Sequence, residues 1–185
     1  MKNIVYAIHG FRGRAEGGWR PWLKQTLQTN EVEVHLLQMP NPNAPIQSEW
    51  LEELTLQFGQ PQTNKFLIGH SLGATTILRF LEKEQFSTPI GGAVLVAGPT
   101  LYPRIVDVKS FFTKPFDWKM INSNCKKIIG LYSTNDPLVS IANAKELENN
   151  LNCKLKIVDG YGHFSGEEGH TNLPIAIELL NEIMD

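Results

Sequence analysis

The sequence of 185 residues has few of the features that mark membrane or nucleic-acid-binding proteins. No apolar run approaches the ~18 residues that are needed to span a bilayer. The 17 basic and 19 acidic residues form no long run of either sign, and the net charge is only −2. These absences argue against nucleic acid or an anionic membrane as the main partner.

Cysteine is scarce: the chain has only Cys125 and Cys153. They have neither metal-ligand nor redox spacing, so we predict no metal site and no cysteine catalysis. Each precedes a predicted strand, which places both at one edge of the expected sheet. Two buried thiols are favoured in a cytosolic chain. A disulfide is the alternative if the two strands are neighbours about 4.8 Å apart.

Targeting and linker segments are also lacking. The start of the chain has Lys2 and an apolar run, but the run is shorter than the ~7–15 residues of a signal-peptide core and ends in His9-Gly10. We interpret it as a first strand and expect a cytoplasmic protein. There is no repeat, low-complexity tract or linker, so we expect one domain over residues 1–185.

What the chain does have is an alternation of short apolar runs and amphipathic segments. The length and Ile/Val content of the runs are typical of strands buried on both faces. The runs are Ile4–His9, Val32–Gln38, Lys65–Gly69, Ala93–Ala97, Lys127–Ser133 and Leu155–Val158. The alternation predicts a doubly wound, mostly parallel six-stranded sheet with helices on both faces.

The segments between these runs show helical spacing. Pro21 falls in the first turn of the first helix, and Ser48 is the expected N-cap of the second. The apolar faces are Trp19, Trp22, Leu23 and Leu27; Trp50, Leu51, Leu54 and Phe58; Ala74, Ile77, Leu78 and Leu81; Ile141, Ala144 and Leu147; and Ile175, Leu179, Leu180 and Ile183.

One connection, Gly98 to Asn124, is long for a compact domain, and such connections are often functional. Its prolines are Pro99, Pro103 and Pro115, and its Phe and Trp residues are Phe111, Phe112, Phe116 and Trp118. Two interpretations carry about equal weight. The aromatic residues form either a wall over a pocket or a satellite hydrophobic cluster under a loop.

The most informative stretch is KFLIGHSLGATTILRFL, where a predicted strand meets Gly69-His70-Ser71-Leu72-Gly73 and a helix follows. A Gly-x-Ser-x-Gly pentapeptide alone is a weak signal, but a nucleophile elbow requires this strand–turn–helix context. The glycines let strand and helix approach closely around a strained serine. The alternative interpretation is a glycine-rich turn with a capping serine.

A serine nucleophile needs a base and an orienting carboxylate. His163 follows the last strand and is the expected base, with His170 as runner-up, whereas His70 points away from Ser71. Asp136 follows a buried strand and is the expected acid, with Asp159 as competitor. The order Ser, Asp, His is the order of the α/β-hydrolase sheet.

Acyl transfer also needs donors for the oxyanion. The backbone N–H of Leu72 should be one, and the N–H of Phe11, in the glycine-rich loop after the first strand, should be the second. We expect Gly10, His70, Phe116 and Trp118 to line the substrate pocket. Neither G-x-G-x-x-G nor a P-loop pattern occurs in this loop, so a phosphate-binding role is disfavoured.

These motifs resemble those of the α/β-hydrolases. The motifs are His9-Gly10, the pentapeptide around Ser71, Asn135-Asp136-Pro137 and Gly162-His163-Phe164. HGFRGRAEGGWRPWLKQTL, PFDWKMINSNCKKIIGLYSTNDPLVS and GYGHF are similar to the small, cap-less serine hydrolases of the YdeN and retinoblastoma-binding-protein-nine type. The resemblance covers essentially the whole chain.

This resemblance implies strand order 2-1-3-4-5-6, no cap domain, no cofactor, and a pocket-lining role for the aromatic segment. It implies that Ser71, Asp136 and His163 form the triad of a carboxylesterase-type enzyme. We therefore expect a serine hydrolase that cleaves small esters, thioesters or amides through an acyl-enzyme. The alternatives are a protein-binding module on a hydrolase scaffold and an acyltransferase, because fold does not determine function.

Overall fold

The computed structural model describes residues 2–102 and 106–185, so Pro103 lies outside the described residues. Within these residues, six strands form one sheet in the order β2-β1-β3-β4-β5-β6. Every neighbouring pair is parallel. The strands are β1 (Asn3–Ile8), β2 (Val32–Leu37), β3 (Lys65–His70), β4 (Gly92–Val96), β5 (Ile128–Ser133) and β6 (Lys154–Val158). The predicted sheet and its order are confirmed.

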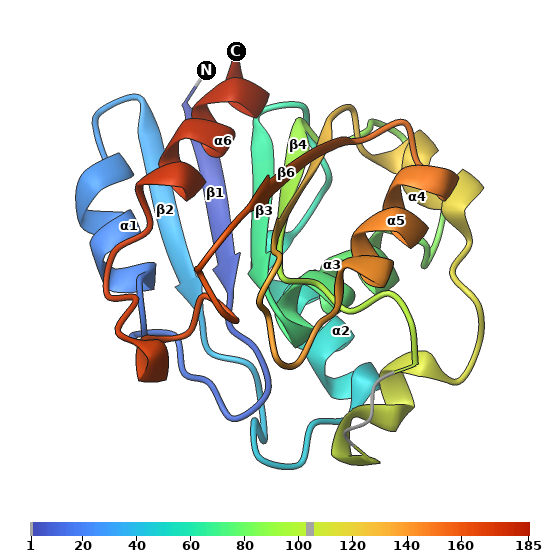
Figure 1. Cartoon of the computed structure of the whole chain (residues 1–185). Helices are drawn as coiled ribbons and strands as arrows, with labels where there is room; N and C mark the ends of the chain where they lie inside the picture. Colours follow the sequence, from blue (N-terminus) through green and yellow to red (C-terminus); the bar gives the residue numbers. More distant parts are fainter. Residues whose placement is uncertain (1, 103–105) are drawn as a thin grey trace.

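Helices cover both faces of the sheet (Figure 1). On one face lie α1 (Arg20–Leu27) and α6 (Pro174–Met184). On the other lie α2 (Gln47–Phe58), α3 (Leu72–Leu81) and α5 (Ile141–Asn150), with the short α4 (Trp118–Asn124) against α3. None of the helices in the described part of the chain has the length and apolar character to cross a membrane.

Each face of the sheet has its own hydrophobic core. Trp19, Leu23 and Leu180 pack against the α1/α6 face, while Trp50 and Ile77 pack against the other. Every described residue of β4 and β5 is buried. Because both faces of these strands are covered, their sequences are continuous apolar runs instead of alternating ones.

The predicted strand boundaries agree with the structure to about one residue, but the predicted helix cap is wrong. Helix α2 begins at Gln47, and Ile46 occupies the N-cap position without a side-chain hydrogen bond. Ser48 therefore lies inside the first turn. The reason is a tertiary contact: the Gln47 N–H donates to Ser110 Oγ, 3.4 Å away, on a separate segment.

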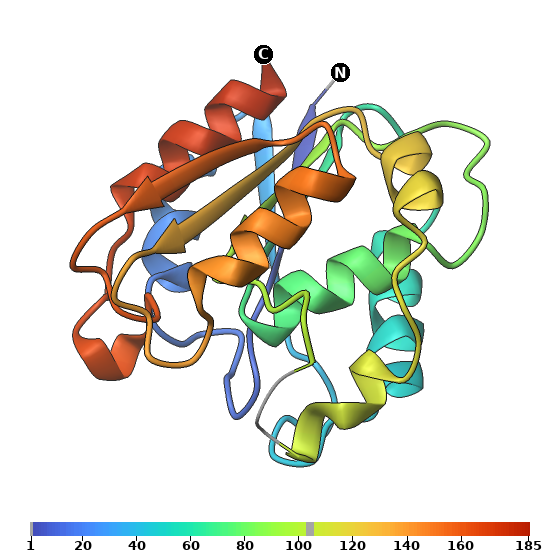
Figure 2. The same ribbon diagram turned by 45° about the vertical axis from the view of Figure 1, so that its right-hand side comes forward.

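The long connection after β4 contains a 3-10 helix, η1 (Val106–Phe112), followed by α4. Figure 2 shows η1 beside α2, and the Phe111 ring lies edge-on to Trp50 with centroids 5.5 Å apart. The buried Arg79 guanidinium donates to the carbonyl oxygens of Phe111 and Lys114 at 2.8 and 2.7 Å. These contacts join the segment to the main core, so Phe111 and Phe116 belong to that core and not to a separate satellite cluster.

Both cysteines are free thiols in the structure. Strands β5 and β6 are neighbours, as the disulfide alternative required, but no disulfide joins Cys125 to Cys153. Burial raises the pKa of the Cys125 thiol to about 12 and that of Cys153 to about 11. The favoured interpretation, two buried thiols, holds for Cys125, whereas Cys153 is only partly buried.

Candidate active site

Ser71 lies at the junction of β3 and α3, at the carboxyl edge of the sheet. Its backbone has φ 54° and ψ −120°, a conformation that residues other than glycine rarely adopt. A Cβ at Gly69 would lie 2.5 Å from the Ala74 nitrogen, and one at Gly73 would lie 2.5 Å from the Ile8 carbonyl oxygen. Both glycines therefore allow the close approach that a nucleophile elbow requires.

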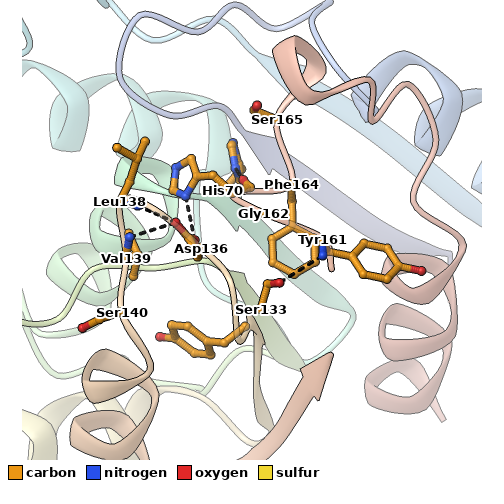
Figure 3. Close-up of polar contacts among 12 residues, drawn as sticks. His70, Ser133, Asp136, Leu138, Val139, Ser140, Tyr161, Gly162, Phe164 and Ser165 are labelled. Atoms are coloured by element: carbon orange, nitrogen blue, oxygen red, sulfur yellow. Dashed lines mark hydrogen bonds and ion pairs between the residues drawn. The ribbon is translucent and has the colours of Figure 1, made fainter. Parts of the chain in front are cut away.

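Asp136 and His163 form a buried pair at the same edge. His163 Nδ1 lies 2.8 Å from Asp136 Oδ2, and the two side chains are 8% and 1% exposed. Figure 3 shows the other carboxylate oxygen accepting the N–H groups of Leu138 and Val139, at 2.8 and 2.9 Å. Because the carboxylate accepts a hydrogen bond from Nδ1–H, the proton of the neutral ring is on Nδ1, and His163 Nε2 keeps a free lone pair that can act as a base.

Glu168, which the sequence analysis missed, holds the backbone of the base. Its carboxylate oxygens accept the His163 N–H at 2.9 and 3.0 Å and the Ser165 N–H at 3.1 Å. Partial burial raises the pKa of Glu168, but these hydrogen bonds outweigh burial and lower it. The S-x-x-E spacing of Ser165 and Glu168 is a capping-box signature that would have revealed the contact of Glu168 with Ser165, but not its contact with His163.

Ser133, at the end of β5, and Asn135, in the loop that carries Asp136, bind the loop that carries His163, here called the base-bearing loop. The Tyr161 N–H donates to Ser133 Oγ at 3.1 Å (Figure 3). The Gly162 N–H donates to Asn135 Oδ1 at 3.0 Å, and Ser133 Oγ donates to the same oxygen at 2.7 Å. The loops after β5 and β6 are therefore connected directly, a contact that no local sequence pattern indicates.

Two ring N–H groups bind successive carbonyl oxygens of the base-bearing loop. His70 Nε2 lies 2.7 Å from the His163 oxygen, and Trp19 Nε1 donates to the Phe164 oxygen at 3.1 Å. His70 is buried and faces this loop. Its predicted contact with substrate stays a prediction.

The two predicted oxyanion donors are free to bind a ligand. Among the described residues, the N–H groups of Leu72 and Phe11 have no hydrogen-bond acceptor. Leu72 is the first residue of α3, where backbone N–H groups have no partner within the helix. A Cβ at Gly10 would lie 2.9 Å from Ser71 Cβ, so the loop after β1 approaches the serine closely.

His9, at the end of β1, helps to shape this loop. Its Nδ1–H donates to the Gly10 carbonyl oxygen at 2.8 Å, and its Nε2 accepts the Met39 N–H at 3.0 Å. Burial lowers the pKa of His9 to about 4. A neutral imidazole therefore connects β1 to the chain that follows β2.

The alternative base, His170, and the alternative acid, Asp159, contact other residues. His170 stacks on Tyr161 with ring centroids 5.4 Å apart. Asp159 accepts a hydrogen bond from Thr134 Oγ1. Of the two candidate bases and two candidate acids, His163 and Asp136 are the ones that the structure pairs. In the described part of the chain, no group of three His, Cys, Asp or Glu residues is suited to hold a metal ion.

Ser71 and His163 lie at the same edge of the sheet, but their side chains are not hydrogen-bonded to each other. Within the described residues, Ser71 Oγ forms no hydrogen bond with His163. His70, the neighbour of Ser71, binds the His163 carbonyl oxygen, and the rings of His70 and His163 are 4.9 Å apart. Catalytic hydrogen bonds are often long without substrate and shorten when it binds.

The aromatic residues Phe116 and Trp118 lie beyond the far end of α3. The Arg79 guanidinium lies over the Phe116 ring, 3.7 Å from its centroid, and Phe116 contacts Trp118. Arg79 is eight residues from Ser71, roughly 12 Å along a helix. Phe116 lines a pocket of about 310 Å³ with Arg79, Thr100, Leu101, Tyr102, Phe112, Thr113, Lys114 and Pro115. Ser71 does not line it, and substrate contact by either aromatic residue stays a prediction.

A parallel sheet of this order with a strained serine at the end of β3 is an α/β-hydrolase fold. The model of the family described as "Serine hydrolase" matches residues 5–182. The chain therefore belongs to the serine hydrolase family.

Relatives cover nearly the whole chain. The Bacillus subtilis (strain 168) protein named "Putative hydrolase YdeN" is 36% identical over 181 residues, which are 97% of this chain and 95% of YdeN. The crystal structure of the ydeN gene product has a TM-score of 0.94 and covers 98% of both chains. Serine hydrolase RBBP9 of Rattus norvegicus is 27% identical over 97% of this chain and 95% of its own.

A more distant structure shows the fold alone. Est1E from Butyrivibrio proteoclasticus, solved with ferulic acid bound, has a TM-score of 0.72 at 15% identity. The match covers 98% of this chain and 88% of Est1E. Together with the closer relatives, it confirms the resemblance that the motifs indicated.

Proposed function

We propose that this serine hydrolase cleaves small carboxylic esters, and also thioesters or amides, through a Ser71–His163–Asp136 triad. The observation that carries the proposal is the buried 2.8 Å contact between His163 Nδ1 and Asp136 Oδ2, at the edge where Ser71 stands. A hydroxyl is a poor nucleophile without a base, and an imidazole oriented by a carboxylate is such a base.

In the proposed reaction, His163 Nε2 takes the hydroxyl proton as Ser71 Oγ attacks the ester carbonyl. The negative charge on the carbonyl oxygen is stabilised by the N–H groups of Leu72 and Phe11. The histidinium then protonates the leaving alcohol, which departs and leaves an acyl-Ser71. Water, deprotonated by His163, attacks this ester and releases the carboxylic acid.

The surroundings of the site support small substrates with an apolar group. Leu138, which directly follows the Asp136-Pro137 turn, is 62% exposed. A large exposed apolar side chain beside a catalytic group offers a contact surface for the acyl or alcohol part of an ester. The fold also has no cap over the sheet edge in its described residues, which favours an open site.

Hydrolysis of p-nitrophenyl acetate by the wild type and by Ser71→Ala tests the proposal. The variant should lose all enzymatic turnover and keep its fold, since alanine occupies the same backbone conformation as serine. Ser140→Ala is the matched control, because Ser140 is exposed and its side chain caps nothing in α5. Undiminished turnover in Ser71→Ala would overturn the assignment.

Labelling with a fluorophosphonate separates an enzyme from a binding module on the same scaffold. An active triad should form a covalent Ser71–phosphorus bond with loss of fluoride, and Ser71→Ala should not be labelled. Absence of labelling in the wild type would favour the binding module. An acyltransferase would be labelled as well, so product analysis with added alcohols or amines is needed to recognise it.

A further inference from the structure

His70 has contacts that the proposed chemistry does not use. Its Nε2 lies 2.7 Å from the carbonyl oxygen of His163. A carbonyl oxygen only accepts, so Nε2 carries the proton and donates it. The bond joins two residues 93 positions apart in the sequence. It connects the end of β3 to the loop that presents the base.

The position of His70 in the chain makes this bond significant. His70 is the last residue of β3 and directly precedes Ser71. The backbone that sets the place of the nucleophile therefore also sets the place of the His70 ring. A hydrogen bond from this ring to His163 determines the spacing between nucleophile and base through a short and rigid path.

The surroundings of His70 hold its ring in place and keep it neutral. Trp19 packs edge-on against it with centroids 6.2 Å apart. Burial lowers the pKa of His70 well below its usual value, and positive charge on His163 or Arg20 acts in the same direction. A neutral ring adds no positive charge beside His163 when that residue accepts the serine proton.

We propose that His70 is a positioning residue, whose Nε2–H bond to the His163 carbonyl oxygen places the base relative to Ser71. The proposal rests on the proposed triad. It differs from the expectation that His70 contacts substrate. The proposal also differs from a purely structural role of His70. If His70 positions the base, its substitution changes turnover only through His163.

Two substitutions at His70 separate the effect of its N–H donor from the effect of its side-chain size. His70→Gln keeps an amide N–H at about the reach of Nε2, whereas His70→Met keeps the size and loses the donor. We expect His70→Met to lower kcat for p-nitrophenyl acetate about tenfold or more, with KM changed less than about twofold. His70→Gln should recover kcat to within about threefold of the wild type. Should the methionine variant not fold, His70→Asn, whose amide is too short to reach, takes its place.

Tyr132→Phe is the matched control. Tyr132 is buried and donates to the Gly98 carbonyl oxygen at 2.8 Å, so the variant also loses a buried side chain–carbonyl bond. That bond does not touch the base-bearing loop. The kcat of Tyr132→Phe should stay within about twofold of the wild type. Its free energy of unfolding should fall, because a buried hydrogen bond is lost.

The decisive measurement is the same His70→Met change in a His163→Ala background. If His70 acts through the base, the second substitution should not lower the residual rate further. An equal loss in both backgrounds, or wild-type kcat in His70→Met, would overturn the inference. Normal turnover in Ser71→Ala and His163→Ala would instead overturn the proposed function, so the two failures are distinguishable.

Discussion

Gly73→Ala tests whether the close approach of α3 to β1 sets the geometry of the active site. A Cβ at this position would lie 2.5 Å from the Ile8 carbonyl oxygen and 2.6 Å from that of His9. Both obstacles are backbone atoms, which no rotamer change can move. Real Cβ contacts are essentially never under 3.0 Å. Helix α3 and strand β1 must therefore separate by about 0.5 Å. This displacement is as large as the tolerance of about 0.5 Å within which catalytic groups must be held.

The expected magnitudes follow from this separation. Forcing a methyl group into a packed site costs about 1–3 kcal/mol. The better helix propensity of alanine returns up to about 1 kcal/mol. We expect a net loss of about 1–2 kcal/mol in the free energy of unfolding. Because Leu72 N–H moves away from Phe11 N–H, kcat/KM for p-nitrophenyl acetate should fall by roughly 10- to 100-fold.

Urea denaturation and ester hydrolysis, measured where the protein stays folded, give the two quantities. Ile183→Val is the control, since it removes one buried methyl group from the core on the opposite face of the sheet. It should cost about 0.5–1.5 kcal/mol and leave kcat/KM unchanged. A Gly73→Ala variant with wild-type stability and turnover would refute the reasoning. Lower stability with full turnover would refute the link between this contact and the oxyanion donors.

Two further predictions concern the buried polar groups. Asp136→Asn keeps an oxygen for the N–H groups of Leu138 and Val139 but turns an amide N–H₂ toward His163 Nδ1–H, so kcat should fall about 10³–10⁴-fold. A loss of less than about tenfold in steady-state assays would contradict the pairing. Because burial lowers the pKa of His9 from 6.5 to about 4, the unfolded chain binds the proton first as pH falls. The free energy of unfolding should be highest above pH 6.5 and decline toward pH 4. His9→Gln should reduce the slope of this free energy against pH by the equivalent of up to about one bound proton. Equal slopes of unfolding free energy against pH in both proteins would disprove the role of His9.

Prediction from the sequence succeeded where the signal is local. A short apolar run predicts the strand around Phe66 and Leu67, and residue periodicity predicts the helix around Ile77 and Leu78. It failed at Ser48, because the acceptor for the start of α2 is Ser110, on a segment far away in the chain. Caps that depend on tertiary neighbours have no reliable pattern in the sequence.

The sequence by itself determined the six strands, the elbow at Ser71, and the edge at which Asp136 and His163 appear. It did so because parallel strands all end at one edge, so residues that follow different strands gather there. Only the tertiary structure decided that His163 and not His170 pairs with Asp136, and that Glu168 and His70 bind the backbone of His163. Those pairings depend on the direction of side chains in turns. Neighbouring loops supply the hydrogen-bond partners there, and no periodic pattern in the sequence predicts them.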